Sequence, residues 1–221
     1  MVNPWLELPK RAPFVLKHDK KSVAKSKFNT HRLPEPFIGN TTEAKLVLLN
    51  LNPSTGKKDR TPQNKGKFAQ AVRANLRSAK SAYPFYYLNP EFERHEGFRW
   101  WNQRLQELLF KCSRKHCARK HLSERILAVE FCAYPSKRKQ EIKGRLAGDD
   151  FRDYLVKGAM KRGAHIIIMK GLQEWLGAIP ELEKYPQTWI LRNPQNANIK
   201  AENLARCANK AFTKILKAVS K

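Results

Sequence analysis

Four short apolar runs, each of strand length, recur along this chain with helical patterns between them. They cover residues 45–51, 125–132, 164–170 and 187–192. Strands that are apolar along their whole length are typical of a parallel sheet whose two faces are both covered by helices. Right-handed crossovers bring the carboxyl ends of such strands to one edge of the sheet. The sequence therefore predicts an α/β fold, a three-layer α/β/α sandwich around a central, mainly parallel four-stranded sheet.

Helices are expected between and after these strands. The spacing of apolar residues predicts helices at 68–78, at 98–111, from Asp149 to Gly163, and after Asn198. The first 40 residues are rich in Pro and Lys and predict an irregular N-terminal wrap. Residues 41–221 are then expected to form a single domain.

Two of the four apolar runs stop at the same dipeptide. The first stops at Asn52 and Pro53, and the fourth stops at Asn193 and Pro194. In a parallel sheet both side-chain amides would lie at the edge where open α/β folds bind ligands. Because Asn-Pro also marks an ordinary turn after a strand, the prediction of a site depends on the pairing of the two turns.

The charge of the chain indicates a polyanionic partner. The 44 Lys and Arg residues outnumber the 19 Asp and Glu residues, which gives a formal net charge of +25. Such an excess favours nucleic acid. An anionic membrane is the alternative, but no apolar run reaches the roughly 18 residues that a spanning helix needs. The start of the chain lacks the apolar stretch of a signal peptide, so a cytoplasmic protein is expected.

Basic loops follow the first two predicted strands, at the edge that carries the first Asn-Pro turn. Side chains in these loops and after the third strand are expected to contact DNA phosphates. They are Lys57, Lys58, Arg60, Ser136, Lys137, Arg138 and Lys170. The alternative is that these cations lie there by coincidence in a chain that has so many of them.

A cluster of cysteine and histidine raises the question of zinc. Cys112, His116, Cys117 and His121 could be four ligands. On one helix, however, the two Cys-His pairs would point about 100° apart, so the four could not close around one ion without a break. We therefore expect no metal and no cofactor, and a cationic surface in this segment.

Three sequence blocks resemble the signatures of a known superfamily. LPEPFIGN, AKLVLLNLNPSTG and WILRNPQN resemble the uracil-DNA glycosylase superfamily, most nearly its mismatch-specific and thymine-DNA glycosylase branch. In that branch the first signature is roughly Gly-x-Asn-Pro-Gly, and the second begins with Asn-Pro. The resemblance covers about residues 34–200. It implies a monofunctional DNA glycosylase, a hydrolase in base excision that leaves an abasic site.

The resemblance also implies roles for individual residues. Asn52 matches the residue that positions the attacking water, and Asn193 matches the residue that steadies the base or its leaving charge. Because a base inside a duplex must be flipped out, Gln195 and Asn196 are expected to fill the gap that it leaves. Chemically, an oxocarbenium-like sugar needs a placed water and a stabilised leaving base rather than a strong acid.

Further residues are expected to contact the flipped base. Tyr86 or Tyr87 could stack on it, although aromatic clusters are more often core. Glu130 is a candidate because a carboxylate in an apolar run is unfavourable without a partner, with a structural hydrogen bond as its alternative. The remaining substrate-binding candidates lie in the first signature and are Asn50, Pro53 and Ser54.

The departures from the family pattern leave the substrate open. Asn50 and Ser54 replace the flanking glycines of the first signature, and no Ser-Gly follows Asn193 and Pro194. The base could be uracil, mismatched thymine, a damaged pyrimidine or a bulkier modified cytosine of phage DNA, the last implying antiviral defence. The alternative function is a non-catalytic basic DNA-binding protein on the same fold. In either case a monomer is expected.

Overall fold

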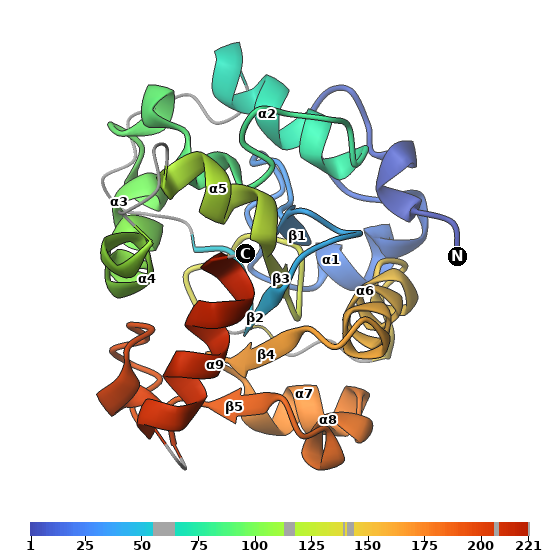
Figure 1. The fold of residues 1–221 in the computed structure, drawn as a ribbon. Coiled ribbons are helices and arrows are strands. Elements are labelled where there is room, and N and C mark those ends of the chain that lie inside the picture. Colours follow the sequence, from blue (N-terminus) through green and yellow to red (C-terminus); the bar gives the residue numbers. More distant parts are fainter. Residues whose placement is uncertain (55–64, 113–117, 139, 141–143, 206–207, 221) are drawn as a thin grey trace.

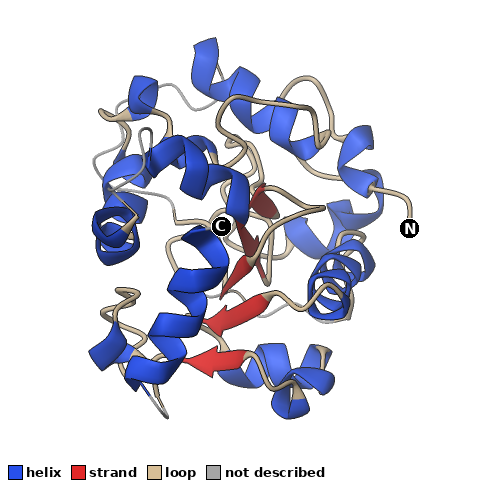
Figure 2. Cartoon of the chain, viewed as in Figure 1, coloured by secondary structure: helices blue, strands red, loops and turns tan. Residues whose placement is uncertain are grey.

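A five-stranded sheet lies at the centre of the molecule, with helices on both sides (Figures 1 and 2). The computed structural model describes residues 1–54, 65–112, 118–138, 140, 144–205 and 208–220. The strand order is β1-β3-β2-β4-β5. These observations confirm an α/β fold, with one strand more than the sequence predicts.

All four predicted strands are present and run parallel to one another. They are β2 (Leu46–Asn50), β3 (Ile126–Glu130), β4 (His165–Ile168) and β5 (Thr188–Ile190). Every residue of β2, β3 and β4 is buried, because helices cover both faces. This burial explains why these runs are apolar throughout rather than alternating.

The fifth strand, β1 (Phe37–Gly39), is antiparallel and pairs with β3 at the sheet edge. It belongs to the first 40 residues, where an irregular wrap is expected. That segment also holds the helix α1 (Lys20–Ala24) and 3-10 turns at Pro4–Glu7 and Lys17–Asp19. Its apolar side chains, Trp5 and Phe14 among them, join the same core as the sheet.

Helices cover both faces of the sheet. On one side lie α5 (Ala118–Arg125) and α9 (Ala208–Ser220), and on the other lie α6 (Asp149–Lys161), α7 (Leu172–Ala178) and α8 (Glu181–Lys184) (Figure 1). The helix α2 (Gly66–Leu76) contacts β1. Three further 3-10 turns cover Tyr86–Leu88, Pro90–Phe92 and Ala201–Asn203.

The predicted helices are found, with two changes. The segment after Asn198 first forms the 3-10 turn at Ala201–Asn203, and the expected last helix is α9, at Ala208–Ser220. The expected helix at 98–111 is divided at Leu105 into α3 (Glu96–Arg104) and α4 (Gln106–Lys111). The helix α6 begins at Asp149 as expected, but Asp149 and Asp150 are not its N-cap: the N-cap residue is Gly148, without a side-chain cap. The Asp149 carboxylate instead accepts a hydrogen bond from the backbone N–H of Leu146, before the helix, at 2.9 Å. The expected end is also confirmed, since Gly163 follows α6 at a φ of 74°.

Within the described part of the chain, no helix has both the length and the apolar character that crossing a membrane requires.

Candidate functional site

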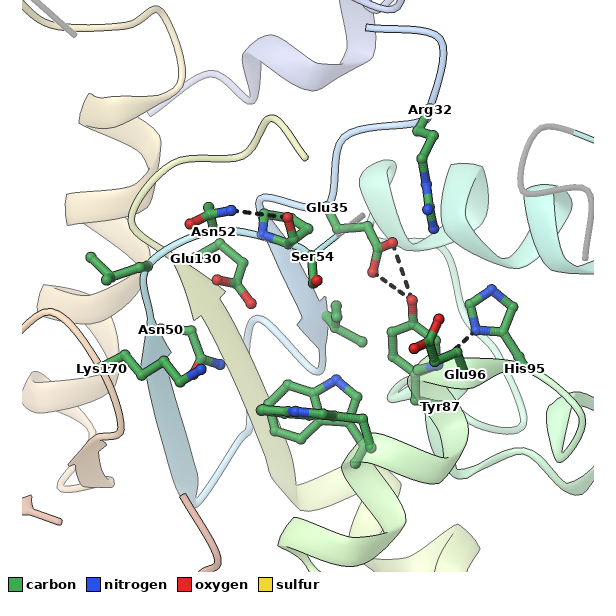
Figure 3. A pocket seen from close by; sticks show the side chains of 16 residues that line it. Arg32, Glu35, Asn50, Asn52, Ser54, Tyr87, His95, Glu96, Glu130 and Lys170 are labelled. Carbon is green, nitrogen blue, oxygen red and sulfur yellow. Dashed lines mark hydrogen bonds between the residues drawn. The ribbon is translucent and has the colours of Figure 1, made fainter. Parts of the chain in front are cut away.

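A cavity of about 240 Å³ opens at the carboxyl edge of the sheet (Figure 3). Its sheet side is formed by Asn50, Asn52, Glu130 and Lys170, which lie at or just after the ends of β2, β3 and β4. Parallel strands place their carboxyl ends together, so residues from three distant parts of the chain meet there. These four residues lie together at the carboxyl edge of the sheet, where the sequence predicts a binding site.

Two of these side chains are buried and carry polar atoms without hydrogen-bond partners among the described residues. Asn50 and Glu130 are the last residues of β2 and β3 and are paired in register. Asn50 is 4% exposed and Glu130 is 7% exposed. Among the described residues, neither atom of the Asn50 amide nor Oε2 of Glu130 has a hydrogen-bond partner. Buried polar atoms are nearly always paired, so these unpaired atoms are candidates for contacts with a ligand or an ordered water.

The Glu130 carboxyl is a neutral acid at pH 7. Burial raises its pKa to about 8, and the negative charge of Glu35 contributes to the increase. The positive charge of Lys170 acts in the opposite direction, as does the neighbouring Asn50 amide, which lies outside hydrogen-bonding geometry. A neutral carboxyl can donate one hydrogen bond and accept others, whereas a carboxylate can only accept.

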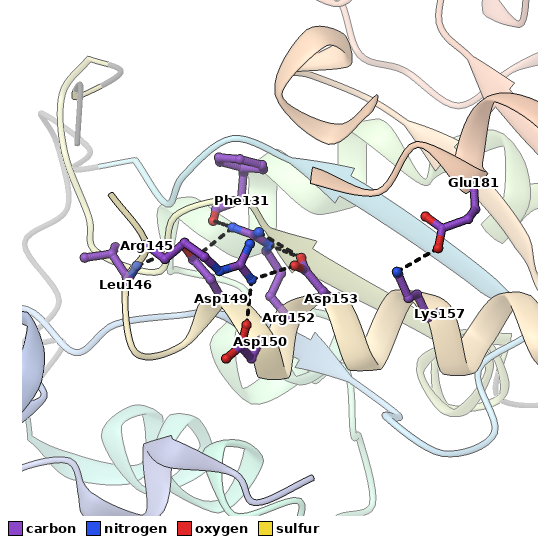
Figure 4. Close-up of polar contacts among 9 residues, drawn as sticks. All are labelled: Phe131, Arg145, Leu146, Asp149, Asp150, Arg152, Asp153, Lys157 and Glu181. Atoms are coloured by element: carbon purple, nitrogen blue, oxygen red, sulfur yellow. Dashed lines mark hydrogen bonds and ion pairs between the residues drawn. The ribbon is translucent and has the colours of Figure 1, made fainter. Parts of the chain in front are cut away.

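A salt-bridge network holds the end of β3 from the side of α6 (Figure 4). Arg152 is 5% exposed and donates to the backbone oxygen of Phe131 at 2.8 Å, directly after Glu130. Its guanidinium also binds the carboxylates of Asp149 and Asp153 at 2.9 and 2.8 Å. The charge of Arg152 is thus balanced within its own helix, and the strand end that carries Glu130 is held in place.

The opposite wall of the cavity carries a buried carboxylate between two tyrosines. The Tyr86 hydroxyl donates to Oε2 of Glu35 at 2.9 Å, and the Tyr87 hydroxyl donates to both Glu35 oxygens at 3.1 and 3.0 Å. Burial, followed by the charge of Glu35, raises the pKa of Tyr86 well above its usual value. Tyr87 lines the cavity, whereas Tyr86 packs its ring edge-on against Phe68 in the core.

The start of α3 closes the cavity beside Tyr87. The Gly97 N–H donates to Nδ1 of His95 at 3.0 Å. A side chain at Gly97 would collide with the Tyr87 ring, so only glycine permits this close packing. The His95 ring stacks on Phe68, with 4.0 Å between the ring centroids.

Tryptophans of α3 supply the largest aromatic surface in the cavity. Trp100 and Trp101 both line it, with 4.7 Å between their ring centroids. The ammonium group of Lys170 lies 5.9 Å from the centroid of the Trp100 ring, and the Arg104 guanidinium lies 4.6 Å from it. The sequence predicts only a helix at 98–111 for this segment, so it does not predict that the two tryptophans line a cavity.

The first Asn-Pro turn lies at the cavity, and its amide is held in one orientation. The Asn52 side-chain nitrogen donates to Oγ and the backbone oxygen of Ser136 at 3.0 and 3.2 Å, and to the backbone oxygen of Pro53 at 3.0 Å. No described residue donates to the Asn52 side-chain oxygen. Since Pro53 and Ser54 also line the cavity, the whole turn is part of its wall.

Ser136 has a different role from the expected phosphate contact. It is 2% exposed, and its hydroxyl donates to the backbone oxygen of Arg138 at 2.6 Å while accepting from Asn52. Its N–H donates to the backbone oxygen of Pro53 at 3.1 Å. Phosphate cannot reach a hydroxyl that is buried in this way. Ser136 instead joins the loops after β2 and β3 and orients Asn52.

The second Asn-Pro turn does not reach the cavity, which corrects the expectation that the two amides converge. Of the described residues that line the cavity, none belongs to this turn, and β4 lies between β2 and β5. The Asn193 side-chain oxygen accepts from the N–H groups of Gln195 and Asn196 at 3.0 and 3.1 Å. Asn193 therefore shapes an exposed loop, on which Gln195 and Asn196 are also exposed.

The remaining predicted residues divide into exposed ones and ones outside the described residues. Lys137 and Arg138 are exposed after β3. Lys57, Lys58 and Arg60 lie outside the described residues, as do His116 and Cys117 of the considered zinc set. Cys112 is buried, and Nε2 of His121 lies 2.9 Å from the backbone oxygen of Val219. The described residues contain no group of three or more His, Cys, Asp or Glu side chains that could hold a metal.

Several cavity residues have no counterpart in the sequence prediction. They are Arg32, Glu35, His95, Glu96 and Trp100. Glu35 had one available signal, because it stands between two prolines in LPEPF immediately before a strand. The others come from loops and a helix start whose placement depends on tertiary packing.

Comparison with models of known protein families, with curated protein sequences and with solved structures finds no match. The chemistry available to the chain is therefore inferred from the cavity. It combines a fixed amide at the opening, a neutral buried carboxyl beside a second amide, and aromatic walls. This combination suits a flat, polar-edged molecule of about the size of one base.

Proposed function

We propose that this chain is a monofunctional DNA glycosylase. It flips a pyrimidine into the cavity and hydrolyses the bond between the base and deoxyribose, leaving an abasic site. The observation that carries the proposal is the placement of Asn52. It belongs to a motif that resembles the glycosylase signature, it lies at the opening of a cavity of about 240 Å³, and its amide is oriented by Ser136.

Asn52 supplies the contact that a hydrolytic step needs most. Departure of the base leaves an oxocarbenium-like sugar, which a water molecule must reach from the correct side. Because the Asn52 nitrogen is occupied by Ser136 and Pro53, its oxygen is the atom that accepts a hydrogen bond from this water. An acceptor held in one orientation does not have to reorganise during the reaction.

The interior of the cavity provides the surroundings for the flipped base. Glu130 and Asn50 offer polar atoms for its edge, and Trp100, Trp101 and Tyr87 offer apolar surface. Interactions of this kind compensate for the few kcal/mol that unstacking a base requires. The cavity leaves room for a pyrimidine that carries a substituent, so uracil, thymine and modified cytosines all remain substrates to test.

DNA would approach the carboxyl edge of the sheet. Lys137, Arg138 and Lys170 lie on this side, and a net charge of +25 favours a polyanion. The loop shaped by Asn193 presents Gln195 to fill the gap in the duplex. We further propose that the fold is the three-layer architecture of the glycosylase superfamily. The protein would act as a monomer on DNA in the cytoplasm, in repair or in antiviral defence.

The test is a panel of labelled DNA duplexes, each carrying one natural or modified pyrimidine. We expect alkali-labile abasic sites from at least one duplex, with the free base identified by mass spectrometry and the release lost in Asn52→Ala. If no base is released while DNA is still bound tightly, the alternative of a non-catalytic DNA-binding protein is correct.

A further inference from the structure

The buried carboxyl at the end of β3 needs an explanation beyond a general pocket for a base. A buried amide can pair with the edge of a pyrimidine without the unfavourable burial of an ionisable group. Here Asn50 already supplies an amide, and Glu130 stands beside it in register. Both residues line the same cavity, and each has buried side-chain atoms without a hydrogen-bond partner among the described residues.

Other charged groups surround Glu130 from several elements. Glu35, bound by Tyr86 and Tyr87, faces it from the loop before β1, and Lys170 faces it from the end of β4 (Figure 3). Asp149 and Arg152 of α6 line a small cavity behind it, and they are paired with each other. Arg32, His95 and Glu96 lie on the far wall of the main cavity.

The 4-amino and 4-keto pyrimidines present different hydrogen-bond donors and acceptors to a carboxyl group. A 4-amino pyrimidine presents an N–H donor at N4 beside the acceptor N3, whereas a 4-keto pyrimidine presents the acceptor O4 beside an N3–H donor. A neutral carboxyl can pair with either edge, because it both donates and accepts. The ring nitrogen N3 of the amine is a much stronger base than the carbonyl oxygen O4, so it accepts the carboxyl proton more strongly, and a protonated carboxyl at this position favours the amine.

The departing bases also differ in how much they need a proton, and the amino base needs it more. Uracil can leave as an anion whose charge is spread over two carbonyl groups, and hydrogen bonds alone stabilise this anion. Cytosine has one carbonyl group fewer to carry the charge, so its departure depends more on receiving a proton. General acids deliver such protons best when they are protonated at the working pH and lie within hydrogen-bond reach.

We propose that Glu130 and Asn50 select a 4-amino pyrimidine, cytosine or a C5-substituted cytosine, and that Glu130 is the acid that protonates its N3. This inference depends on the proposed glycosylase function. The O–H of Glu130 is directed to N3, and its other oxygen accepts from the N4 amine. Asn50 pairs with the remaining polar atoms of the same edge.

The proton and electron balance of this step is complete. The pair of electrons in the bond from N1 to the sugar carbon moves onto the base, and N3 takes the proton from Glu130. A water held by Asn52 forms the new bond to the sugar carbon and loses one proton, which returns Glu130 to its acid form through solvent. The products are the free base and an abasic sugar, with no oxidant or metal required.

The test uses DNA strands that differ only at position 4 of the pyrimidine. The pairs are cytosine and uracil, 5-methylcytosine and thymine, and 5-hydroxymethylcytosine and 5-hydroxymethyluracil. Each base is placed opposite an alkali-stable abasic analogue, so that no difference in base pairing affects flipping. Release rates are measured for the wild type, Glu130→Gln and Glu183→Gln, with thermal unfolding as the control for folding.

We expect the amino member of at least one pair to be released at least ~10-fold faster than its keto partner. Glu130→Gln retains shape and hydrogen bonds but has no acidic proton, so it should lower release of the amino member by about 100-fold and affect the keto member far less. Glu183→Gln changes an exposed carboxylate of α8 that does not line the cavity, and it should leave the ratio unchanged. Faster release of the keto members, or equal losses in Glu130→Gln, would overturn the inference while leaving the glycosylase function intact.

A binding measurement separates this inference from a failure of the proposed function. The same pairs, made with a 2′-fluorinated sugar that resists cleavage, are titrated with wild type and Glu130→Gln. Tighter binding of the amino members by about fivefold or more, reduced in the variant, supports the selection of amines even if no base is released. Equal affinity for both members of every pair contradicts it.

Discussion

The two Asn-Pro turns of this protein have the same sequence chemistry and different surroundings. At Asn52 the side-chain nitrogen is bound by Ser136 and the residue lines the cavity. At Asn193 the side-chain oxygen is bound by its own loop, and the residue is exposed. One amide is thus held through its nitrogen at the wall of a cavity, whereas the other uses its oxygen to hold a turn.

The difference shows that a dipeptide determines a turn but not the role of its side chain. That role depends on the hydrogen-bond partner, which is a serine from another loop for Asn52 and two nearby N–H groups of the same loop for Asn193. The cavity turn also lies beside the buried carboxyl of Glu130, which has no equivalent at the exposed turn.

The largest expected effect concerns the dependence of stability on pH. The pKa of Glu130 is raised from 4.5 to about 8 by folding. The folded protein therefore binds a proton that the unfolded chain has lost between these pH values. The free energy of unfolding should fall as the pH rises through this window, by up to the order of 5 kcal/mol, and the stabilisation is complete only below about pH 4.5.

Glu130→Gln should remove this component, because glutamine does not titrate. The measurement is urea unfolding of the wild type and the variant at pH 5 and pH 8. The variant should be less stable than, or equal to, the wild type at pH 5 and should gain relative to it at pH 8. A stability difference that does not change between the two pH values would refute the neutral carboxyl.

The second prediction concerns the exposed turn. Asn203 is 8% exposed, accepts from the N–H of Asn193 at 3.0 Å, and donates to the backbone oxygens of Asn196 and Asn198 at 2.8 and 2.9 Å. Asn203→Ala should lower the free energy of unfolding by about 2–3 kcal/mol. Base release per folded molecule should stay within about threefold, because this turn does not line the cavity. Loss of release from a fully folded variant would place the turn in the chemistry.

A smaller effect is expected from the partner of Asn52. Ser136→Ala removes one of the three acceptors that hold the Asn52 nitrogen and keeps the two backbone oxygens. The amide should then be oriented less strictly, and the rate of base release should fall by roughly 10-fold. DNA affinity, measured by titration of labelled duplex, should not change. An unchanged rate would show that Ser136 does not orient the catalytic amide.

The sequence predicts the parallel part of the sheet well, for a physical reason. Strands buried on both faces are mostly apolar, and β2, β3 and β4 show this pattern except at their ends, where Asn50, Glu130 and His165 lie. The strand β1 is not predicted, because its three residues between Pro36 and Asn40 are too few to show a repeating pattern of apolar residues. Its pairing with β3 also depends on the rest of the fold.

For the site, the sequence predicts residues at strand ends and fails elsewhere. Asn52, Glu130 and Lys170 can be placed because parallel strands end at one edge. Glu35 and His95 cannot, since only tertiary packing brings their loops to the cavity. Asn193 shows the opposite error, in which a correctly predicted turn receives a role that its hydrogen bonds do not support.

The most direct test of the account compares Asn52→Ala with Asn193→Ala on the DNA substrate that releases its base fastest. Loss of a positioned polar group in a catalytic site lowers rates by about 100- to 1000-fold, and this is the result expected for Asn52→Ala, with DNA affinity preserved. Asn193→Ala should retain base release within about fivefold, since its amide holds a surface turn. Equal losses in the two variants, or the larger loss in Asn193→Ala, would contradict the assignment of hydrolysis to the amide at the cavity.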